Sequence, residues 1–458
     1  MRILITGGGE VATQLAARLI REGNEIVIVE QDAARCARLE ESLDASIVQG
    51  SAASVKTLHR AGIAGADMLI AVTSSDEVNI LTCLIAQADG DVKVKAARVR
   101  THEVDHWRRI CEHSALHIDL IIHPESLALG RILPVLPIPG VSDIVEFADG
   151  RVKLFGMNIE PDHWMVGMSL VEIANCGAPP NSLVAMVFRG AEVIIPRGGE
   201  KILAGDHVYV VARNDDFDEV LRFLGLRRQE KVERVFILGG KQIGIAAAQA
   251  LEKQGVAVKI FERDAERCRK IAEILEHTIV VHGDGTDAAL LMGENIRGAG
   301  AYLALTADDE DNLIAAILAR RLGARKVVAL INRLNYLPIA QRLGINTSVS
   351  PRMVTVDRIL QFVRKGQVVS VTSFREEEAE AIELVATAES PYVGRKLKDI
   401  RLPEGAIVGA VARPDGSVVV PRGNFTIEAG DRVIFFALER MVSRLESAFL
   451  AERRRLPW

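Results

Sequence analysis

The feature that most constrains this chain is an internal repeat. The stretch AVTSSDEVN returns as ALTADDEDN, and IIPRGGEKILAGDHVYVVA returns as VVPRGNFTIEAGDRVIFFA. These matched pairs lie at 71–79 and 304–312, and at 194–212 and 419–437. Gly7 likewise corresponds to Gly239, and Glu30 to Glu262, both at an offset of 232 residues. Matches that keep their order with only small changes of offset indicate a duplicated unit.

The first part of each unit alternates strand-like runs with helical patterns. In the first copy the β-branched runs are RILIT, EIVIVE, SIVQG, DMLIAVT and VKAARVR. Apolar periodicity between the runs predicts helices, including Val11 to Ile20, one from Asp76 and one from about Glu103. Strands that alternate with helices predict an α/β fold with a Rossmann-like, doubly wound parallel sheet.

The second part of each unit predicts a small α+β lobe. Its strands are short, and turn residues at 413–416 (RPDG) and at Gly205-Asp206 predict hairpins. The charged stretch LRRQEKVE at 226–233 lacks apolar periodicity and is the expected linker between the two units. The sequence therefore predicts two N-lobes, each followed by a C-lobe: 1–133, 134–225, 231–365 and 366–452.

Composition excludes several classes of protein. The net charge is −5 and aromatic residues make up 4% of the chain, without a basic stripe, so nucleic acid is not an expected partner. Five scattered cysteines without a C-x-x-C motif are typical of buried thiols in a reducing cytosol: Cys36, Cys83, Cys111, Cys176 and Cys268. No uncharged apolar run reaches 18 residues, so we do not expect the chain itself to span a membrane, and docking onto a protein that does span it stays open.

Two glycine-rich turns predict phosphate-binding sites at helix N-termini. In the first copy Gly7, Gly9 and Ala12 take the three positions of G-x-G-x-x-G/A, and Glu30 ends the next strand. That carboxylate suits a free ribose hydroxyl and repels a 2′-phosphate, which favours NAD or adenine nucleotides over NADP. The second copy repeats the pattern with Gly239, Lys241, Gly244 and Glu262. The alternative is a fold inherited without its ligand, in either copy.

Polar residues follow two further strands of the predicted sheet. After Thr73, either Ser74 or Ser75 is suited to cap the next helix, and the same residues are candidates for ligand contact. Strand alternation places Arg98 and Arg100 on one face, which favours an anion between them, although pairing with surface acids is the alternative. In the second copy the matched positions are Ile331 and Arg333, so one of the two charges is missing.

These motifs, in order and twice over, resemble the TrkA family, the regulatory subunits of bacterial Trk potassium-uptake systems. The resemblance covers essentially the whole chain and rests on GGGEVA, VTSSDEVNI, AARVR, LGGKQIG, LTADDEDN, LPEGAIVGAVAR and IEAGDRVIFF. It implies two tandem RCK units (also called KTN) in a tetrameric homo-oligomeric ring beneath a membrane-embedded potassium-translocating subunit. It further implies that NAD(H) and ATP or ADP bind the N-lobes and change the shape of the ring to gate flux.

The resemblance also implies which residues bind the nucleotides. Gly7, Gly9 and Ala12 would cradle phosphates, with Glu30 on the ribose and Arg98 and Arg100 near phosphate; Gly239, Gly244, Glu262 and Asp284 would act in the second copy. With their neighbours, the candidate residues in the first copy are Gly7, Gly8, Gly9, Glu10, Val11, Ala12, Glu30, Gln31, Gly50, Ser51, Thr73, Ser74, Asp76, Asn79, Arg98 and Arg100. Those in the second copy are Gly239, Gly240, Lys241, Gln242, Ile243, Gly244, Glu262, Arg263, Gly283, Asp284, Thr306, Asp309, Asn312 and Arg333.

The sequence departs from the family pattern in the two glycine turns. Glu10 places a carboxylate in the first turn, where it would disfavour a triphosphate unless it points to solvent. Lys241 replaces the middle glycine of the second turn, and its side chain would block the usual approach of a pyrophosphate. The second site is then empty, or it holds phosphates displaced toward the lysine, or Lys241 simply points to solvent and the lobe is structural.

One motif suggests a different chemistry. HEVDH at 102–106 matches the H-E-x-x-H helix of zinc proteases, and His113, His117 and His123 follow it. The second copy has LNYLP at that place, without histidine, and the predicted lobe offers no protease core. We therefore expect no metal site.

An NAD-dependent oxidoreductase is the alternative function. Its sheet would look the same, but it needs a substrate domain with an acid or base aimed at the nicotinamide. The two C-lobes are small and show no such constellation, so we expect a ligand-gated regulator without catalytic residues.

Overall fold

The computed structural model describes residues 1–101, 107, 117–190, 192–227, 232–345, 347–364, 368–374 and 378–450. It contains four sheets. Two are six-stranded with the orders β3-β2-β1-β4-β5-β6 and β14-β13-β12-β15-β16-β17, and their strands run parallel. The strand order reverses beside the first strand of each sheet, as in doubly wound folds. The predicted α/β class and the duplication are both confirmed.

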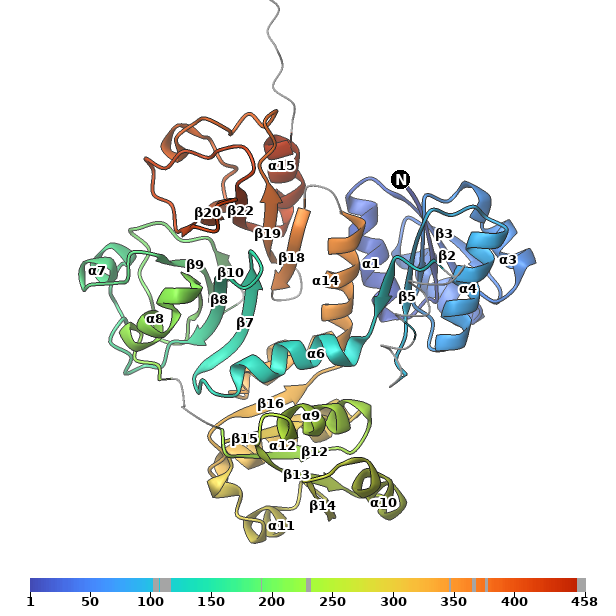
Figure 1. Cartoon of the computed structure of the whole chain (residues 1–458), viewed down its shortest axis with the longest axis horizontal. Coiled ribbons are helices and arrows are strands. Elements are labelled where there is room, and N and C mark those ends of the chain that lie inside the picture. The colour runs from blue at the N-terminus through green and yellow to red at the C-terminus, as the bar shows by residue number, and fades with distance from the viewer. Residues whose placement is uncertain are drawn as a thin grey trace, which may run out of the picture. The chain divides into compact units, whose positions relative to one another are not determined.

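The first N-lobe belongs to a compact unit formed by residues 1–128 and 351–363. Its strands are β1 (Arg2–Thr6), β2 (Glu25–Glu30), β3 (Ser46–Gln49), β4 (Met68–Ala71), β5 (Val94–Arg98) and β6 (Leu120–Ile122). Its helices are α1 (Glu10–Arg21), α2 (Ala33–Ser42), α3 (Val55–Arg60) and α4 (Asp76–Ala88). The central strands are buried on both faces by helices (Figure 1), so they read as continuous apolar runs rather than alternating ones.

Helix α14 (Pro351–Val363) packs against α1 of this same unit (Figure 1). Val356, Ile359 and Leu360 are fully buried in the core beneath the first sheet. The division of the sequence places this segment in 231–365, yet its core contacts are with the first N-lobe. A helix from the second copy therefore completes the hydrophobic core of the first.

The second compact unit holds the second N-lobe and both C-lobes. The strands of the N-lobe are β12 (Arg234–Leu238), β13 (Ala257–Glu262), β14 (Ile279–His282), β15 (Ala301–Ala304), β16 (Val327–Leu330) and β17 (Thr347–Val349). Its helices are α9 (Gln242–Glu252), α10 (Ala265–Ile274), α11 (Ala288–Gly293), α12 (Asp309–Arg321) and α13 (Leu337–Arg342). Helix α6 (Pro124–Ile132) runs from the first unit into the second.

The two C-lobes are five-stranded antiparallel sheets with the orders β10-β9-β11-β8-β7 and β18-β19-β22-β20-β21. The first contains β7 (Val141–Phe147), β8 (Val152–Asn158), α7 (Leu170–Asn175), β9 (Ser182–Arg189), β10 (Glu192–Ile194), β11 (His207–Arg213) and α8 (Phe217–Phe223). The second contains β18 (Val368–Phe374), β19 (Ala379–Val385), β20 (Ala406–Ala412), β21 (Val418–Val419), β22 (Arg432–Leu438) and α15 (Glu439–Leu450). One buried cluster, which includes Phe147, Tyr209, Phe374 and Phe436, joins the two lobes.

Two predictions about these lobes differ in outcome. The turn at 413–416 connects the antiparallel strands β20 and β21, as predicted. The prediction of a hairpin at Gly205-Asp206 is wrong. The turn lies between β10 and β11, but these two strands do not pair with each other, because each of them pairs with β9. Gly205 has a φ of +84°, so the turn chemistry was correct, but turn residues do not specify which strands pair.

Cysteine burial was predicted only in part. The four cysteines that the structure describes are free thiols. Cys36 and Cys83 are buried, whereas Cys268 is half-buried and Cys176 is exposed, so the prediction of buried thiols is wrong for the last two. Within the described ranges, no helix has both the length and the apolar character needed to cross a membrane.

Candidate functional site

The first glycine turn joins β1 to α1 at the carboxyl edge of the sheet. Gly7 has a φ of +97°, and a Cβ there would lie 3.0 Å from the backbone N and Cα of Thr73. Gly9 is the N-cap of α1, and a Cβ built on it would have open space around it. The first N–H groups of a helix have no partner within the helix, and beside Gly9 no atom lies within 4 Å of the place that a Cβ would take.

Glu30 is tied directly to this turn. Its side chain is buried, with one oxygen accepting from the N–H of Gly8 at 2.5 Å and the other from the N–H of Asp32 at 2.9 Å. A Cβ on Gly8 would lie 2.7 Å from Cδ1 of Leu39 and 2.9 Å from the Glu30 carboxylate. The acid that the sequence assigns to ribose thus also fixes the conformation of the turn.

The polar residues after β4 form a closed network. Ser75 caps α4, accepting from the N–H of Val78 at 3.2 Å. The amide oxygen of Asn79 accepts from the N–H and hydroxyl of Thr73 at 2.8 and 2.7 Å. The Asn79 amide nitrogen donates to the carbonyls of Thr73 and Arg98 at 3.1 and 2.8 Å. Of the two proposed caps Ser75 is the one used, and buried Asn79 joins the ends of β4 and β5.

Arg98, which ends β5, and Arg100, two residues beyond it, have different surroundings. Arg98 donates from Nη2 to the carbonyl of Thr73 at 2.7 Å, while its buried Nε has no hydrogen-bond partner among the described residues. Burial lowers the pKa of Arg98, and the neighbouring Arg100 lowers it further. Arg100 pairs through Nε with Glu125 at 3.0 Å. Arg100 is therefore paired with an acid, but Glu125 is buried and not a surface acid, while the Nε of Arg98 is without a partner in the part of the chain that the structure describes.

Asp76 supports the loop that follows β5. Its carboxylate accepts from the backbone N–H groups of Arg100 and Thr101 at 2.8 and 2.9 Å. In the second lobe Asp309 does the same for Asn332 and Arg333, at 2.8 and 2.7 Å. Both aspartates are candidates for ligand contact, and in both lobes their carboxylates accept from backbone N–H groups of the following loop.

Glu10 is paired with a residue that sequence reasoning missed. Arg352, at the start of α14, forms an ion pair with the Glu10 carboxylate. Burial lowers the pKa of Arg352. The pairing compensates the negative charge of Glu10 beside the turn. Arg352 lies 342 residues away in the second copy, so no local pattern reveals it.

The second glycine turn keeps the same backbone despite Lys241. Gly239 has a φ of +103°, and Lys241 is the N-cap of α9 with φ −83° and ψ −177°, close to the −79° and 176° of Gly9. The Lys241 side chain is exposed. A Cβ on Gly244 would lie 2.0 Å from the carbonyl oxygen of Gly239, so glycine is required there.

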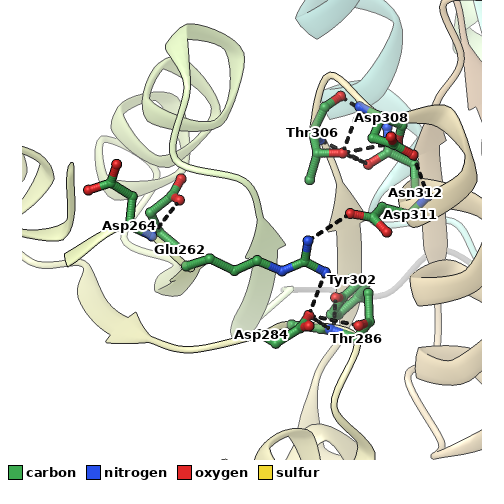
Figure 2. Close-up of polar contacts among 11 residues, drawn as sticks. Glu262, Asp264, Asp284, Thr286, Tyr302, Thr306, Asp308, Asp311 and Asn312 are labelled. Atoms are coloured by element: carbon green, nitrogen blue, oxygen red, sulfur yellow. Dashed lines mark hydrogen bonds and ion pairs between the residues drawn. The ribbon is translucent and has the colours of Figure 1, made fainter. Parts of the chain in front are cut away.

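Glu262 repeats the role of Glu30. It is buried and accepts from the N–H groups of Gly240 and Asp264, both at 3.0 Å. After β15 the amide oxygen of Asn312 accepts from the N–H and hydroxyl of Thr306 at 2.9 and 2.8 Å (Figure 2). The duplication therefore extends to individual hydrogen bonds.

The second lobe differs in its charged side chains. Arg263, directly after β13, donates to Asp284 at 2.9 Å and to Asp311 at 3.0 Å (Figure 2). Burial alone would raise the pKa of Asp284, but hydrogen bonds from Thr286 and Arg263 hold it below its usual value. Arg333, a candidate for phosphate contact, is exposed and pairs with Glu310 at 2.9 Å.

The remaining candidates lie around the same edges. Val11, Ala12 and Ile243 are buried in the first turns of α1 and α9. Gln31, Gly50, Ser51 and Ser74 follow strands of the first sheet, and Gly283 and Gln242 lie at the corresponding edge of the second. Each lobe thus gathers its candidates at the carboxyl edge of its own sheet.

The zinc-protease motif at 102–106 and His113 lie outside the described residues. His117 lies 3.6 Å from Asp119, and His123 is hydrogen-bonded to Ser126 at 2.7 Å. In the part of the chain that the structure covers, no group of three metal-binding side chains gathers.

Comparison with known proteins places these lobes in a family. The TrkA-N domain matches residues 3–124 and 235–351, and the TrkA-C domain matches 154–225 and 381–450. The Trk system potassium uptake protein TrkA of Halomonas elongata is 38% identical, with 96% of each chain covered. That of Vibrio alginolyticus is 36% identical over 98% of each chain.

Solved structures share the architecture. The GsuK RCK domain superposes with a TM-score of 0.60 at 18% identity, covering 98% of this chain and 95% of that one. The GsuK channel bound to NAD gives the same TM-score over 98% of this chain and 79% of that one. The fold is thus two tandem RCK units, each a Rossmann-like lobe followed by a small C-lobe. With both domains matched twice over most of its length, the chain belongs to the TrkA family of Trk potassium-uptake proteins.

Proposed function

We propose that the chain is a peripheral regulatory subunit on the cytoplasmic side of the membrane. It senses NAD(H) and ATP or ADP in the lobes 1–133 and 231–365, and the lobes 134–225 and 366–452 transmit the change. The receiver is a membrane-embedded Trk potassium-translocating subunit, and the sensor works as a tetrameric homo-oligomer. Support comes from the family and from GsuK, a channel of the same fold that has been solved bound to NAD and to ADP.

The observation that carries this proposal is the first glycine turn. Gly9 opens α1 with unobstructed space beside it, and buried Glu30 is fixed next to that space by Gly8. These groups suit a nucleotide: helix N–H groups for the phosphates and a carboxylate for the ribose hydroxyls. In the proposal Gly7, Gly9 and Ala12 hold the phosphates.

Arg98, at the end of β5, and Arg100, just after it, allow the first site to distinguish nucleotides by their number of phosphates. Arg98 has a buried Nε without a partner in the described ranges, and the side chain of Arg100 is half exposed. A further phosphate that reaches either guanidinium gains a charged hydrogen bond, about 1.5–3 kcal/mol. Converting a 1:99 equilibrium to 99:1 takes about 5.5 kcal/mol. Several protomers acting together reach that value, provided the contact forms in only one state of the ring.

Calorimetric titration of the full chain with NADH, NAD, ATP and ADP tests the proposal. We expect binding at the first lobe to be abolished by Gly9→Asp, since a carboxylate there meets the phosphates, and Arg100→Ala to reduce the difference between ATP and ADP. Potassium flux through the reconstituted membrane subunit should then lose its response to nucleotide. Hydride transfer from NADH to a substrate would instead favour the oxidoreductase, and absence of nucleotide binding would overturn the proposal.

A further inference from the structure

Three charged residues cross the carboxyl edge of the second sheet. The Arg263 guanidinium is held between two carboxylates, 2.9 Å from Asp284 and 3.0 Å from Asp311. Arg263 follows β13, whereas Asp311 is in the first turn of α12, the helix after β15. Because β12 lies between β13 and β15 in the sheet, the arginine spans the edge beside the second glycine turn.

The carboxylate of Asp284 is itself fixed in place. It accepts from the N–H of Thr286 at 2.8 Å and from its hydroxyl at 2.7 Å (Figure 2). Asp311 is anchored through its backbone N–H, which donates to the helix cap Asp308 at 2.9 Å. The arginine therefore binds two acids that the local backbone holds in position. Its Nη1 donates to Asp311 and its Nη2 donates to Asp284.

At the three corresponding positions of the first lobe, all of them described, the charges are missing. Glu30 and Glu262 are equivalent positions of the repeat, and in the sheets they pair with Gln49 and His282. Two residues further along the chain, Ser51 therefore corresponds to Asp284. The repeat alignment likewise places Gln31 opposite Arg263 and Val78 opposite Asp311. All three counterparts are uncharged. Whatever the three charges do is therefore particular to the second lobe.

We infer that Arg263, Asp284 and Asp311 form a latch that keeps the second nucleotide site closed until a ligand displaces the guanidinium. This latch, as we call these three residues, lies where ligands bind in open α/β sheets, outside the carboxyl ends of the strands. The inference rests on the proposed nucleotide binding and deepens it. The second site binds the nucleoside part of the ligand less tightly than its glycine turn and Glu262 would otherwise allow.

The strength of the latch follows from its exposure. The side chains of Arg263, Asp284 and Asp311 are 50%, 44% and 34% exposed. Ion pairs this accessible are weak singly and screened by salt. We therefore expect opening the latch to tighten binding by about three- to tenfold, and the gain to shrink at high ionic strength.

The test titrates the full chain with ADP in a Gly9→Asp background, so that only the second lobe binds. Arg263→Gln installs the residue of the first lobe, and Asp311→Asn removes one acid while keeping the arginine. The latch predicts that both variants bind ADP more tightly than the parent at low salt and similarly to it in about 1 M salt. If Arg263→Gln weakens binding while Asp311→Asn does not, the arginine contacts the ligand and the latch is overturned.

The first lobe supplies the matched controls. Gln31→Arg alone should cost the first site less ADP affinity than the full set of three changes does, because Ser51 and Val78 cannot hold the guanidinium. Adding Ser51→Asp and Val78→Asp transplants the latch and should weaken that site. An equal loss from Gln31→Arg alone would show that the arginine acts without the acids.

Hydrogen exchange measured without nucleotide separates the latch from the proposed function. Arg263→Gln should speed exchange of the Thr286 amide, which donates to Asp284, and of the first turn of α12. Unchanged exchange overturns the latch even if nucleotides bind. Faster exchange in a chain that binds no nucleotide at either lobe would retain the latch as a local contact and reject the proposed function.

Discussion

Glu30 accepts a hydrogen bond from the backbone N–H of Gly8 at 2.5 Å, across 22 residues of sequence. The second lobe repeats this with Glu262 and Gly240 at 3.0 Å. The acid at the end of the second strand therefore holds the glycine turn in both copies, independently of any ribose. A change at this acid is expected to affect both the fold and the binding of nucleotide.

Replacing Glu30 should lower stability in a graded way. Glu30→Ala leaves the buried N–H of Gly8 without a partner, which costs about 1–3 kcal/mol in the free energy of unfolding. Glu30→Gln keeps one acceptor oxygen and should lose less. Urea unfolding followed by circular dichroism measures both variants. Equal stability of Glu30→Ala and the parent would show that the hydrogen bond contributes nothing.

The adjacent glycines of the first turn should respond differently to alanine. A Cβ on Gly8 lies 2.7 Å from Cδ1 of Leu39, so Gly8→Ala should destabilise the chain by about 1–3 kcal/mol. A Cβ on Gly9 meets open space, so Gly9→Ala should leave stability within about 0.5 kcal/mol but reduce nucleotide affinity. Thermal unfolding and ADP titration of both variants separate the two effects. A Gly9→Ala variant that binds as tightly as the parent argues against phosphate at this turn.

What the sequence predicted well follows from local patterns. Apolar runs such as those of Arg2–Thr6 and Glu25–Glu30 became the parallel strands, because a strand covered on both faces must be apolar throughout. The helix from Asp76 and its serine cap were predicted for the same reason, since capping depends on neighbouring residues.

What the sequence did not predict depends on residues brought together by the fold. Arg352 reaches Glu10 from the other copy, and Arg263 reaches Asp311 across 48 residues. Neither pairing has a local signature, because charged surface positions pair according to tertiary geometry. The predicted hairpin at Gly205-Asp206 failed for a similar reason: turn residues predict a reversal of the chain, but not which strand pairs with β10.

The third glycine positions offer a matched pair of substitutions. Gly244→Ala places a Cβ 2.0 Å from the carbonyl oxygen of Gly239 and should destabilise the second lobe by about 1–3 kcal/mol. The counterpart in the first lobe is already alanine, and Ala12→Gly should cost only about 0.5–1 kcal/mol through helix entropy. Urea unfolding of the two variants checks the order. If Gly244→Ala and Ala12→Gly lower the free energy of unfolding by the same amount, the close contact at Gly244 does not restrict that position to glycine.

Arg18 and Asp357 form a buried pair that joins α14 to α1. Their charged groups are 3.9 Å apart and their side chains are 2% and 8% exposed. Arg18→Met leaves a carboxylate buried without its cation, and we expect a loss of about 3–5 kcal/mol. Arg18→Met combined with Asp357→Leu should recover most of that loss. A double variant no more stable than the single one would mean that packing of α14, rather than charge, dominates; urea unfolding distinguishes them.

A buried lysine should make stability depend on pH. Lys326, just before β16, donates to the backbone carbonyls of Ile138 and Val141, at the start of the first C-lobe. Burial lowers its pKa from 10.5 to about 7, an effect that the carboxylate of Asp143 partly opposes. Between about pH 7 and 10 the unfolded chain therefore holds a proton that the folded chain has released. Stability must rise with pH over this range, and fall as pH drops toward 7.

Lys326→Met removes this proton and should flatten the pH dependence by up to about 1.4 kcal/mol per pH unit. Urea unfolding at pH 7, 8 and 9 gives the difference between variant and parent, in which other titrating groups largely cancel. Lys93→Met is the control, because Lys93 is the exposed counterpart in the first lobe and should leave the slope unchanged. If the difference between Lys326→Met and the parent stays constant from pH 7 to 9, the lysine does not titrate there and remains charged in the folded chain.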